Sequence, residues 1–237
     1  MGERLLSEIL GSGRGLIVVA ARAEAEAVTR AFALEGDPRE WTATRLDHRL
    51  DLLLTGIGKA NAAGAVARCL GADTYRAVVN LGVCGSLPDL AGRMLPPGEA
   101  ALGTAAAFAD EGLLSPEGFR DVAEMGFGPL SDLPGGGVSI PCDAALVRAL
   151  SALGGLSGTI ATVSTCSGTD ALALEIARRS GAPVEAMEGA AIALVSARLR
   201  TPFAEWRVVS NTTGDRARQR WDLRLALSRL TEAAARL

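Results

Sequence analysis

The run Gly15-Leu16-Ile17-Val18-Val19-Ala20 (GLIVVA) is a short apolar segment, and a helical pattern, RAEAEAVTRAFAL (22–34), follows it closely. The same order recurs along the chain. Further strand-like runs are LDLLLT (50–55), AVVNLG (77–82), GTIATV (158–163), APVEAM (182–187) and FAEWRVVS (203–210), and most of them precede a helical pattern, the last of which runs from about 221 to 237. Buried strands that alternate with helices predict an α/β fold with a mainly parallel, twisted central sheet and helices on both faces.

The composition is that of one globular domain over residues 1–237. The chain is 49% hydrophobic, which is ample for one large core. Residues 86–100 and 110–141 are richer in Gly and Pro, and we interpret them as loop excursions rather than a second domain.

Charge and hydropathy exclude several classes of partner. The net charge of −3 gives no electrostatic case for binding nucleic acid, and no apolar run approaches the length of a membrane span. The N-terminal stretch has acidic residues and glycines where a signal peptide needs an unbroken apolar core. We therefore expect a cytoplasmic protein without a membrane or nucleic-acid partner.

Cysteine and histidine offer little for catalysis. The four cysteines are widely spaced and form no C-x-x-C pair, so they indicate neither a zinc site nor a disulfide framework. His48 is the only histidine and lies in the polar run RLDHRL, where a surface or turn position is the simpler interpretation. A triad built on His48 would need a nucleophile and an orienting group brought to it.

Polar residues follow several of the predicted strands. Ligands of open α/β sheets bind outside the carboxyl ends of the strands. The residues placed there are Glu24, Val83 to Ser86, Ser164 to Asp170, Glu188, and Ser210-Asn211. We expect these residues to share one ligand-binding rim.

Each of these signals also has a simpler interpretation. TGIGKANAAG (55–64) resembles a nucleotide loop but carries Asn61 where a dinucleotide fingerprint needs Gly, so a tight strand-to-helix turn is favoured. Glu24 and Glu26 suit the first turns of a helix because of its dipole, and Asn211 suits a turn. Glu188 is harder to dismiss, because its neighbours in MEGAAIALV are almost all apolar and a buried carboxylate needs a partner.

Together, two glutamates and one asparagine on one rim suggest cleavage of a glycosidic bond. One carboxylate can activate water, another can hold sugar hydroxyls as the ring gains oxocarbenium character, and the third group can stabilise the leaving group. This chemistry requires no metal, histidine or thiol, so we expect no cofactor and no metal site.

The chain resembles the nucleoside phosphorylase/nucleosidase superfamily over nearly its full length. The resemblance lies in TGIGK (55–59), NLGVCGSL (80–87), VEAMEGAAIA (184–193) and TPFAEWRVVSN (201–211). It implies a nucleoside and water as partners. It also implies a homo-oligomer, expected as a dimer.

The resemblance assigns roles by position. Glu24 is similar to the glutamate that activates water, although Glu26 offers a second register. Met187 and Glu188 are similar to the pair that packs on the sugar and holds its hydroxyls. The remaining substrate-binding positions implied are Ile57, Val83, Cys84, Gly85, Thr165, Gly168, Thr169 and Ser210.

Two departures from the family pattern indicate which purine base is released and which nucleophile attacks. Asn211 stands where adenine-specific relatives carry aspartate, and an amide can both donate to O6 and accept from N7–H, so a 6-oxopurine is indicated. Asn80 and Val83 replace the arginine and serine with which phosphorylases grip phosphate, so water is the expected nucleophile. The tail from Ser210 to Trp221 implies futalosine as the substrate, with Arg216, Arg218 or a partner subunit's arginine for its carboxylate.

Three alternatives stay open at this point. One is a nucleosidase for methylthioadenosine or S-adenosylhomocysteine, which Asn211 opposes. Another is a 6-oxopurine nucleoside phosphorylase, and a third is a sensor that keeps the pocket without catalysis.

Overall fold

The apolar runs form the centre of the molecule. The computed structural model describes residues 4–72, 75–130 and 137–237. Within these residues, nine strands form the main sheet: β1 (Gly15–Val19), β2 (Ala43–Arg45), β3 (Leu50–Leu54), β4 (Ala77–Ser86), β5 (Ala100–Phe108), β8 (Ser139–Pro141), β9 (Leu156–Thr162), β10 (Val184–Ala186) and β11 (Phe203–Thr212). The α-helices are α1 (Ser7–Leu10), α2 (Arg22–Ala31), α3 (Lys59–Ala72), α4 (Ala144–Leu150), α5 (Asp170–Ser180), α6 (Gly189–Arg198) and α7 (Leu223–Ala234).

The α/β prediction is confirmed, but the sheet is mixed rather than clearly parallel. Strands β3, β1, β4 and β11 run parallel to one another, and β5, β9 and β10 form a second parallel group. The two groups meet in antiparallel pairs, β5 with β11 and β10 with β4. The connection from β4 to β5 contains no helix that could carry the chain back, and strands joined in this way run in opposite directions.

Part of the sheet closes on itself. β10 pairs with β9 on one side and with β4 on the other, so β4, β11, β5, β9 and β10 form a ring. This closure places Val184 and Glu185, at the start of β10, beside Ser86 and Gly85 at the carboxyl end of β4. The predicted ligand residues therefore meet through ring closure and not along the edge of an open sheet.

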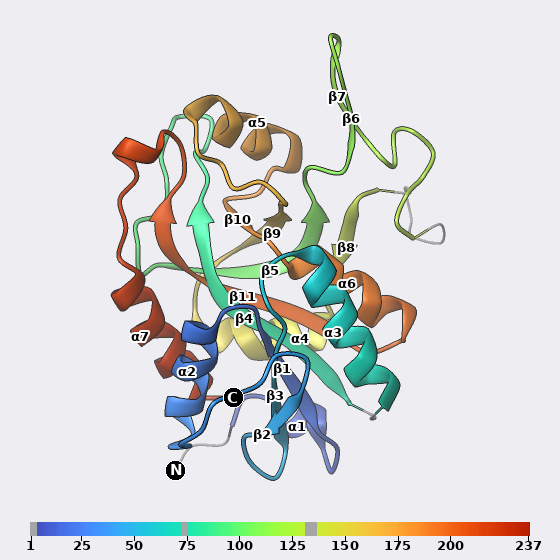
Figure 1. Ribbon diagram of the computed structural model, residues 1–237, viewed down its shortest axis with the longest axis vertical. Helices are drawn as coiled ribbons and strands as arrows, with labels where there is room; N and C mark the ends of the chain where they lie inside the picture. Colours follow the sequence, from blue (N-terminus) through green and yellow to red (C-terminus); the bar gives the residue numbers. More distant parts are fainter. Residues whose placement is uncertain (1–3, 73–74, 131–136) are drawn as a thin grey trace.

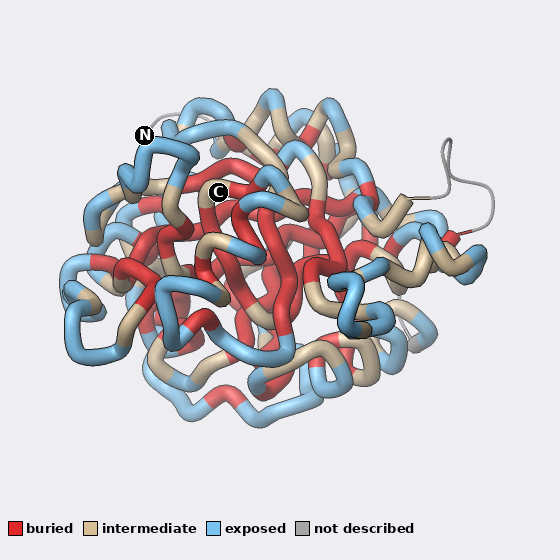
Figure 2. Tube along the Cα trace, turned by 90° about the horizontal axis from the view of Figure 1, so that it is seen from above, coloured by how far each residue is buried: buried red, intermediate tan, exposed pale blue. Residues whose placement is uncertain are grey.

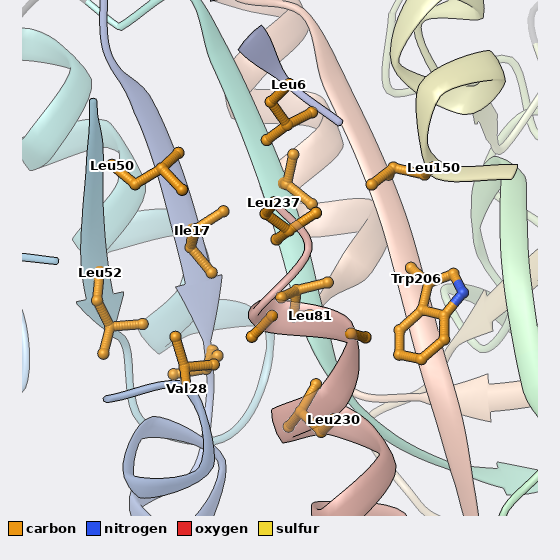
Figure 3. Close-up of a cluster of buried hydrophobic side chains, with 14 of the residues drawn as sticks. Leu6, Ile17, Val28, Leu50, Leu52, Leu81, Leu150, Trp206, Leu230 and Leu237 are labelled. Carbon is orange, nitrogen blue, oxygen red and sulfur yellow. The ribbon is translucent and has the colours of Figure 1, made fainter. Parts of the chain in front are cut away.

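Helices cover both faces of the sheet, as the sequence predicts. Alternate residues of β1 point to opposite faces: Ile17 and Val19 pack in one cluster with α2, α4 and α7, and Leu16 and Val18 pack in another with α3 and α6. Figure 1 shows α2 and α7 on one side of the sheet and α3 and α6 on the other. Figure 3 shows side chains of the first cluster, and Figure 2 shows the buried strands enclosed by more exposed segments.

The β6–β7 hairpin and strand β5 were not predicted from the sequence. Residues 110–141 contain a hairpin of β6 (Gly112–Ser115) and β7 (Gly118–Asp121), which projects from the body of the molecule (Figure 1). Residues 131–136 of that predicted loop lie outside the described residues. Strand β5 has five alanines and one glycine, residues of low strand propensity, so its composition did not indicate a strand.

Other predictions have mixed outcomes. His48 is exposed in the bend between β2 and β3, which confirms a surface turn position. No helix in the described part of the chain is long and apolar enough to cross a membrane. That residues 1–237 make up a single domain stays a prediction.

The start of α6 generates a stability prediction. A Cβ atom on Gly189 would lie 2.1 Å from Oε2 of Glu205, a fully buried side chain held by Arg207 and Asn80. We expect Gly189→Ala to lower the free energy of unfolding by about 1–3 kcal/mol, because the carboxylate has no room to move. Urea unfolding measures the change.

The matched control is Gly71→Ala, on an exposed part of α3. A methyl group there meets no neighbouring side chain within 4 Å, so we expect no loss and a gain of up to about 1 kcal/mol. Equal unfolding midpoints for the two variants would contradict tight packing of Glu205 on α6.

Candidate active site

One cavity collects most of the predicted ligand residues. Its volume is about 520 Å³, and it lies where β1, β4 and β11 approach the ends of β9 and β10. Of the predicted site residues, those lining it are Glu24, Ile57, Val83, Cys84, Gly85, Gly168, Met187, Glu188, Ser210 and Asn211. The structure therefore brings together residues from six separate parts of the chain.

Two predicted residues do not line this cavity. Thr169 is the N-cap of α5, where its Oγ1 accepts a hydrogen bond from the Leu172 N–H at 3.2 Å. Thr165 is exposed, and its N–H is directed at the carboxylate of Asp110. Both threonines hold the loop between β9 and α5 in place.

Glu24 is the buried member of the Glu24/Glu26 pair. It lies in the first turn of α2 and is 3% exposed, whereas Glu26 faces solvent. Its Oε2 accepts hydrogen bonds from the N–H groups of Ala20 (3.0 Å) and Ala21 (2.9 Å), and its Oε1 accepts from Val83 N–H (2.8 Å). Burial raises the pKa of Glu24, and the nearby Arg207 guanidinium opposes that rise.

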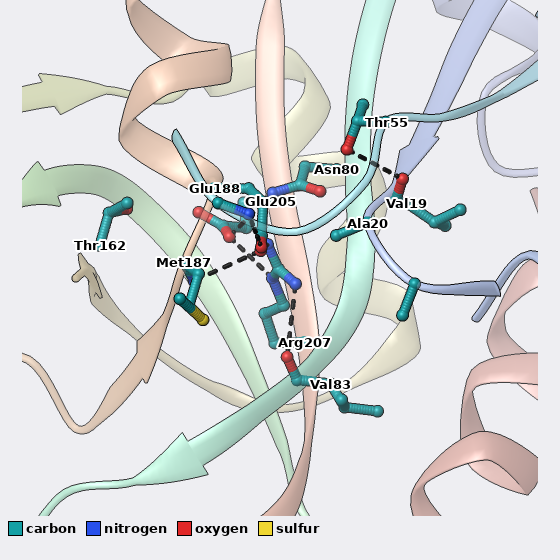
Figure 4. A network of polar contacts seen from close by, with 12 residues as sticks. Val19, Ala20, Thr55, Asn80, Val83, Thr162, Met187, Glu188, Glu205 and Arg207 are labelled. Atoms are coloured by element: carbon teal, nitrogen blue, oxygen red, sulfur yellow. Dashed lines mark hydrogen bonds and ion pairs between the residues drawn. The ribbon is translucent and has the colours of Figure 1, made fainter. Parts of the chain in front are cut away.

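Arg207 is the centre of a buried ionic network beneath the cavity. Its Nε donates to Glu205 Oε1 at 2.8 Å, and its Nη2 lies 3.3 Å from Glu188 Oε2 (Figure 4). Asn80 donates to the same Glu205 oxygen at 3.0 Å. Glycine at position 82 leaves the room for this packing, because a Cβ there would lie 2.5 Å from both Arg207 Nη1 and Glu24 Oε1.

The network holds more carboxylates than cations. Burial favours the neutral form of Arg207, but Glu205, Glu188 and Glu24 together raise the pKa of this guanidinium. Burial also raises the pKa of Glu205, whose Oε2 has no hydrogen-bond partner among the described residues. Burial therefore raises the pKa of both Glu24 and Glu205, although each lies near the Arg207 cation.

Glu188 connects this network to the cavity wall. It precedes α6, and its Oε1 accepts a hydrogen bond from the Gly58 N–H at 3.0 Å. The TGIGK turn thus binds the glutamate through its backbone, in agreement with the interpretation of this segment as a strand-to-helix turn. Met187, the preceding residue, lines the cavity beside Cys166.

Asn211 and Ser210 lie at an irregularity in β11. The pairing with β4 shifts between Val209 and Asn211, so Ser210 is the extra residue of a β-bulge. Ser210 Oγ lies 2.8 Å from Asn211 Oδ1 and 3.2 Å from the Cys84 carbonyl, and Asn211 Nδ2 donates to the Thr212 carbonyl at 3.0 Å. The amide keeps one donor hydrogen and one acceptor site for a ligand.

The opening of the cavity carries an arginine on an aromatic ring. Arg216 lies over the ring of Trp221, with 4.6 Å from its Cζ to the ring centroid, and it donates to Gln219 Oε1 at 2.9 Å. All three residues line the cavity. Arg218 does not line it and instead forms ion pairs with Asp170 and Asp215.

The sequence-based search missed Arg207, Glu205 and Glu185. A signal existed in FAEWRVVS, where Glu205 and Arg207 are two residues apart in an otherwise apolar strand and so share one face. Opposite charges on the same face of a buried strand indicate an internal ion pair. Glu185 also lines the cavity. The sequence analysis assigned the carboxylate of that segment to Glu188, three residues further on, and did not consider Glu185.

Comparison with known proteins places the chain in a family. The model of the phosphorylase superfamily matches residues 16–237. A futalosine hydrolase of Streptomyces coelicolor is 37% identical over 233 residues, covering 94% of both chains. A futalosine hydrolase of Thermus thermophilus is 36% identical over 210 residues, covering 86% of this chain and 88% of the relative.

Solved structures share the fold at lower identity. A 5'-methylthioadenosine/S-adenosylhomocysteine nucleosidase from Neisseria meningitidis, in complex with methylthio-immucillin-A, superposes with a TM-score of 0.71 at 23% identity, covering 94% of this chain and 95% of that one. Native futalosine hydrolase of Helicobacter pylori strain 26695 has a TM-score of 0.70 at 16% identity, covering 94% of each chain. This chain belongs to the phosphorylase superfamily.

Proposed function

We propose that this protein hydrolyses the N-glycosidic bond of futalosine and releases hypoxanthine. The observation that carries the proposal is that Glu24 and Glu188, two buried carboxylates, face one cavity together with the carboxamide of Asn211. Relatives that are 36–37% identical over most of the chain are futalosine hydrolases. The chain is therefore an N-glycosyl hydrolase of a purine nucleoside.

The residues divide the reaction between them. Glu24 takes a proton from the attacking water, since its raised pKa makes it a stronger base than an exposed glutamate. Glu188 accepts hydrogen bonds from the ribose hydroxyls while positive charge develops on the sugar ring. Asn211 binds O6 and N7 of the departing hypoxanthine with its remaining donor and acceptor.

Water is the nucleophile because the cavity offers no suitable site for phosphate. In the described part of the chain, the cations lining the cavity are Arg207 and Arg216. Arg207 already interacts with three carboxylates, and a phosphate dianion beside it would face excess negative charge. Asn80, at the position of a phosphate-binding arginine in phosphorylases, is buried against Glu205.

Arg216 is the residue that receives the carboxylate of futalosine. It lines the cavity, and no ion pair to it occurs among the residues that the structure describes. Arg218 is a poorer candidate because two aspartates already compensate its charge. The ring of Trp221 beneath Arg216 adds a flat apolar surface for the benzoate-like group.

The oligomeric state, the cellular location and the pathway are part of the same proposal. The protein acts as a homo-oligomer, expected as a dimer, in the cytoplasm, where its reaction serves menaquinone biosynthesis. A methylthioadenosine/S-adenosylhomocysteine nucleosidase is the alternative, since proteins with that activity share the fold. Asn211 opposes it, because adenine presents an amino donor at C6 in place of O6.

A substrate comparison tests the proposed function. We expect hypoxanthine release from futalosine without phosphate, slower release from inosine, which lacks the benzoate-like carboxylate, and little adenine release from methylthioadenosine. Chromatography of the released base, with and without phosphate, measures all three. A strict phosphate requirement would indicate a phosphorylase, and adenine as the preferred product would indicate the alternative nucleosidase.

Glu24→Gln tests the general base. The amide cannot take a proton from water, so we expect kcat to fall by roughly 100-fold or more with the fold intact. In the wild type, kcat/KM should decline as pH falls through the raised pKa of Glu24, because the protonated carboxyl is inactive as a base.

Glu26→Gln is the matched control, since it makes the same change two residues away on the exposed side of α2. It should leave kcat and its pH profile unchanged. Loss of activity in Glu26→Gln, with Glu24→Gln still active, would move the role to the other glutamate.

Arg216→Met tests recognition of the substrate carboxylate. Loss of a charge-assisted hydrogen bond should lower kcat/KM for futalosine by roughly 10- to 100-fold. Hydrolysis of inosine should change little, because inosine has no carboxylate to bind. Arg218→Met is the control and should not alter the futalosine-to-inosine ratio; the reverse pattern would assign the carboxylate to Arg218.

A further inference from the structure

Glu205 is a fully buried carboxylate that lies outside the cavity lined by Glu24 and Glu188. Its Oε1 accepts a hydrogen bond from Arg207 Nε at 2.8 Å and another from Asn80 Nδ2 at 3.0 Å (Figure 4). Because Glu205 does not line the cavity, it cannot contact a substrate bound there. The reaction proposed above therefore gives this carboxylate no role.

Packing fixes the position of Glu205 and, through it, the position of the guanidinium. A Cβ atom on Gly189 would lie 2.1 Å from Glu205 Oε2, so the carboxylate is pressed against the start of α6. The shortest contact of Arg207 is the one with Glu205, since its Nη2 lies 3.3 Å from Glu188 Oε2 and its Nη1 lies 3.3 Å from the Val83 carbonyl oxygen. Arg207 is thus held most closely by a side chain outside the cavity.

Glu24 lies close to the same guanidinium without forming an ion pair with it. Val83 connects the two, because its N–H donates to Glu24 Oε1 at 2.8 Å and its carbonyl accepts from Arg207 Nη1. A Cβ atom on Gly82 would lie 2.5 Å from both Arg207 Nη1 and Glu24 Oε1, so the cation and the general base border one small space. At this range the charge of Arg207 acts directly on the ionisation of Glu24 and lowers its pKa.

A cation beside a general base weakens that base, because it stabilises the ionised carboxylate. An uncompensated Arg207 would therefore reduce the affinity of Glu24 for the proton of water. Glu205 and Glu188 both face Arg207 and raise the pKa of its guanidinium. In the proposed reaction Glu188 also binds ribose hydroxyls, whereas Glu205 contacts only the protein and stays beside Arg207 throughout.

The other titratable groups around the network contribute no charge to it. Cys84 of β4 and Cys142, just before α4, both lie near Glu205, and burial raises the pKa of each thiol, so both are neutral where a carboxyl group titrates. Glu185 of β10 forms no ion pair with Arg207, both being described residues. The charge balance at the general base therefore depends on the ionic network itself.

We propose that Glu205 is a positioning residue that offsets the charge of Arg207 and thereby keeps Glu24 basic enough to take a proton from water. Glu205 acts through Arg207 and touches neither the substrate nor the attacking water. This inference rests on the proposed function and deepens it, because it assigns control of the general base to a residue outside the cavity.

Glu205→Gln tests the proposal, because it removes the charge and keeps the shape. The amide oxygen can still accept from Arg207 Nε and Asn80 Nδ2. With less negative charge beside it, Arg207 stabilises ionised Glu24 more strongly, so we expect the pKa of Glu24 to fall by roughly half a unit or more. The acid limb of the kcat/KM profile should move to lower pH by the same amount, and kcat should fall severalfold because the base is weaker.

Infrared difference spectroscopy as a function of pH titrates Glu24 without any substrate. The carboxyl band that Glu24→Gln removes belongs to Glu24, and the same substitution in the Glu205→Gln background assigns the band there. Asp51→Asn is the matched control, since Asp51 is also buried and ion-paired, with Arg14 at 2.9 Å, but lies near the amino end of β3. It should leave the titration midpoint of Glu24 unchanged.

A purely structural role for Glu205 predicts a lower free energy of unfolding in Glu205→Gln with an unchanged Glu24 midpoint, and that result would overturn the proposal. Glu205→Met makes the same charge change if the amide prevents folding. If neither variant folds, wild type decides: a Glu24 midpoint above the ordinary glutamate value supports the proposal, and one at or below it overturns it. A lowered midpoint in Glu205→Gln, without futalosine hydrolysis by wild type, would support the effect of Glu205 on Glu24 and reject the proposed function.

Discussion

The burial of Arg207 is the constraint on which the site depends. A guanidinium this deep in the protein requires carboxylates around it, and Glu205 and Glu188 contact it directly while Glu24 lies nearby. Each of those carboxylates belongs to a different element, so the ionic network joins α2, the start of α6 and β11. The same network keeps Glu24 and Glu188 at the cavity, where the proposed chemistry needs them.

Ring closure of the sheet supplies the second half of the site. An open parallel sheet would keep β10 away from β4, whereas here Glu185 pairs with Gly85 in the antiparallel ladder. The bulge at Ser210 then places Asn211 opposite the same glycine. In the proposed mechanism, the buried charges serve water activation, and the backbone register of neighbouring strands serves base recognition.

Sequence reasoning succeeded for the apolar runs that form strands and for the polar residues that follow them. The run GLIVVA is rich in β-branched residues that favour strands, and most of the polar residues predicted to follow the strands line one cavity. It failed for β5, which consists largely of alanine with low strand propensity, and for Arg207, which lies inside a strand rather than at its end. The Glu24/Glu26 ambiguity also needed the structure, because a two-residue shift on a helix changes which side chain is buried.

By itself, the sequence determined the α/β class, the order of the principal strands and helices, and the residue types available for glycosidic chemistry. These follow from local periodicity and from the few polar residues that interrupt apolar runs. Only the tertiary structure decided strand direction, ring closure and the pairing of Glu185 and Asn211 across Gly85. Those depend on contacts between segments about 100 residues or more apart in the chain, and no local pattern encodes which strand will be a neighbour.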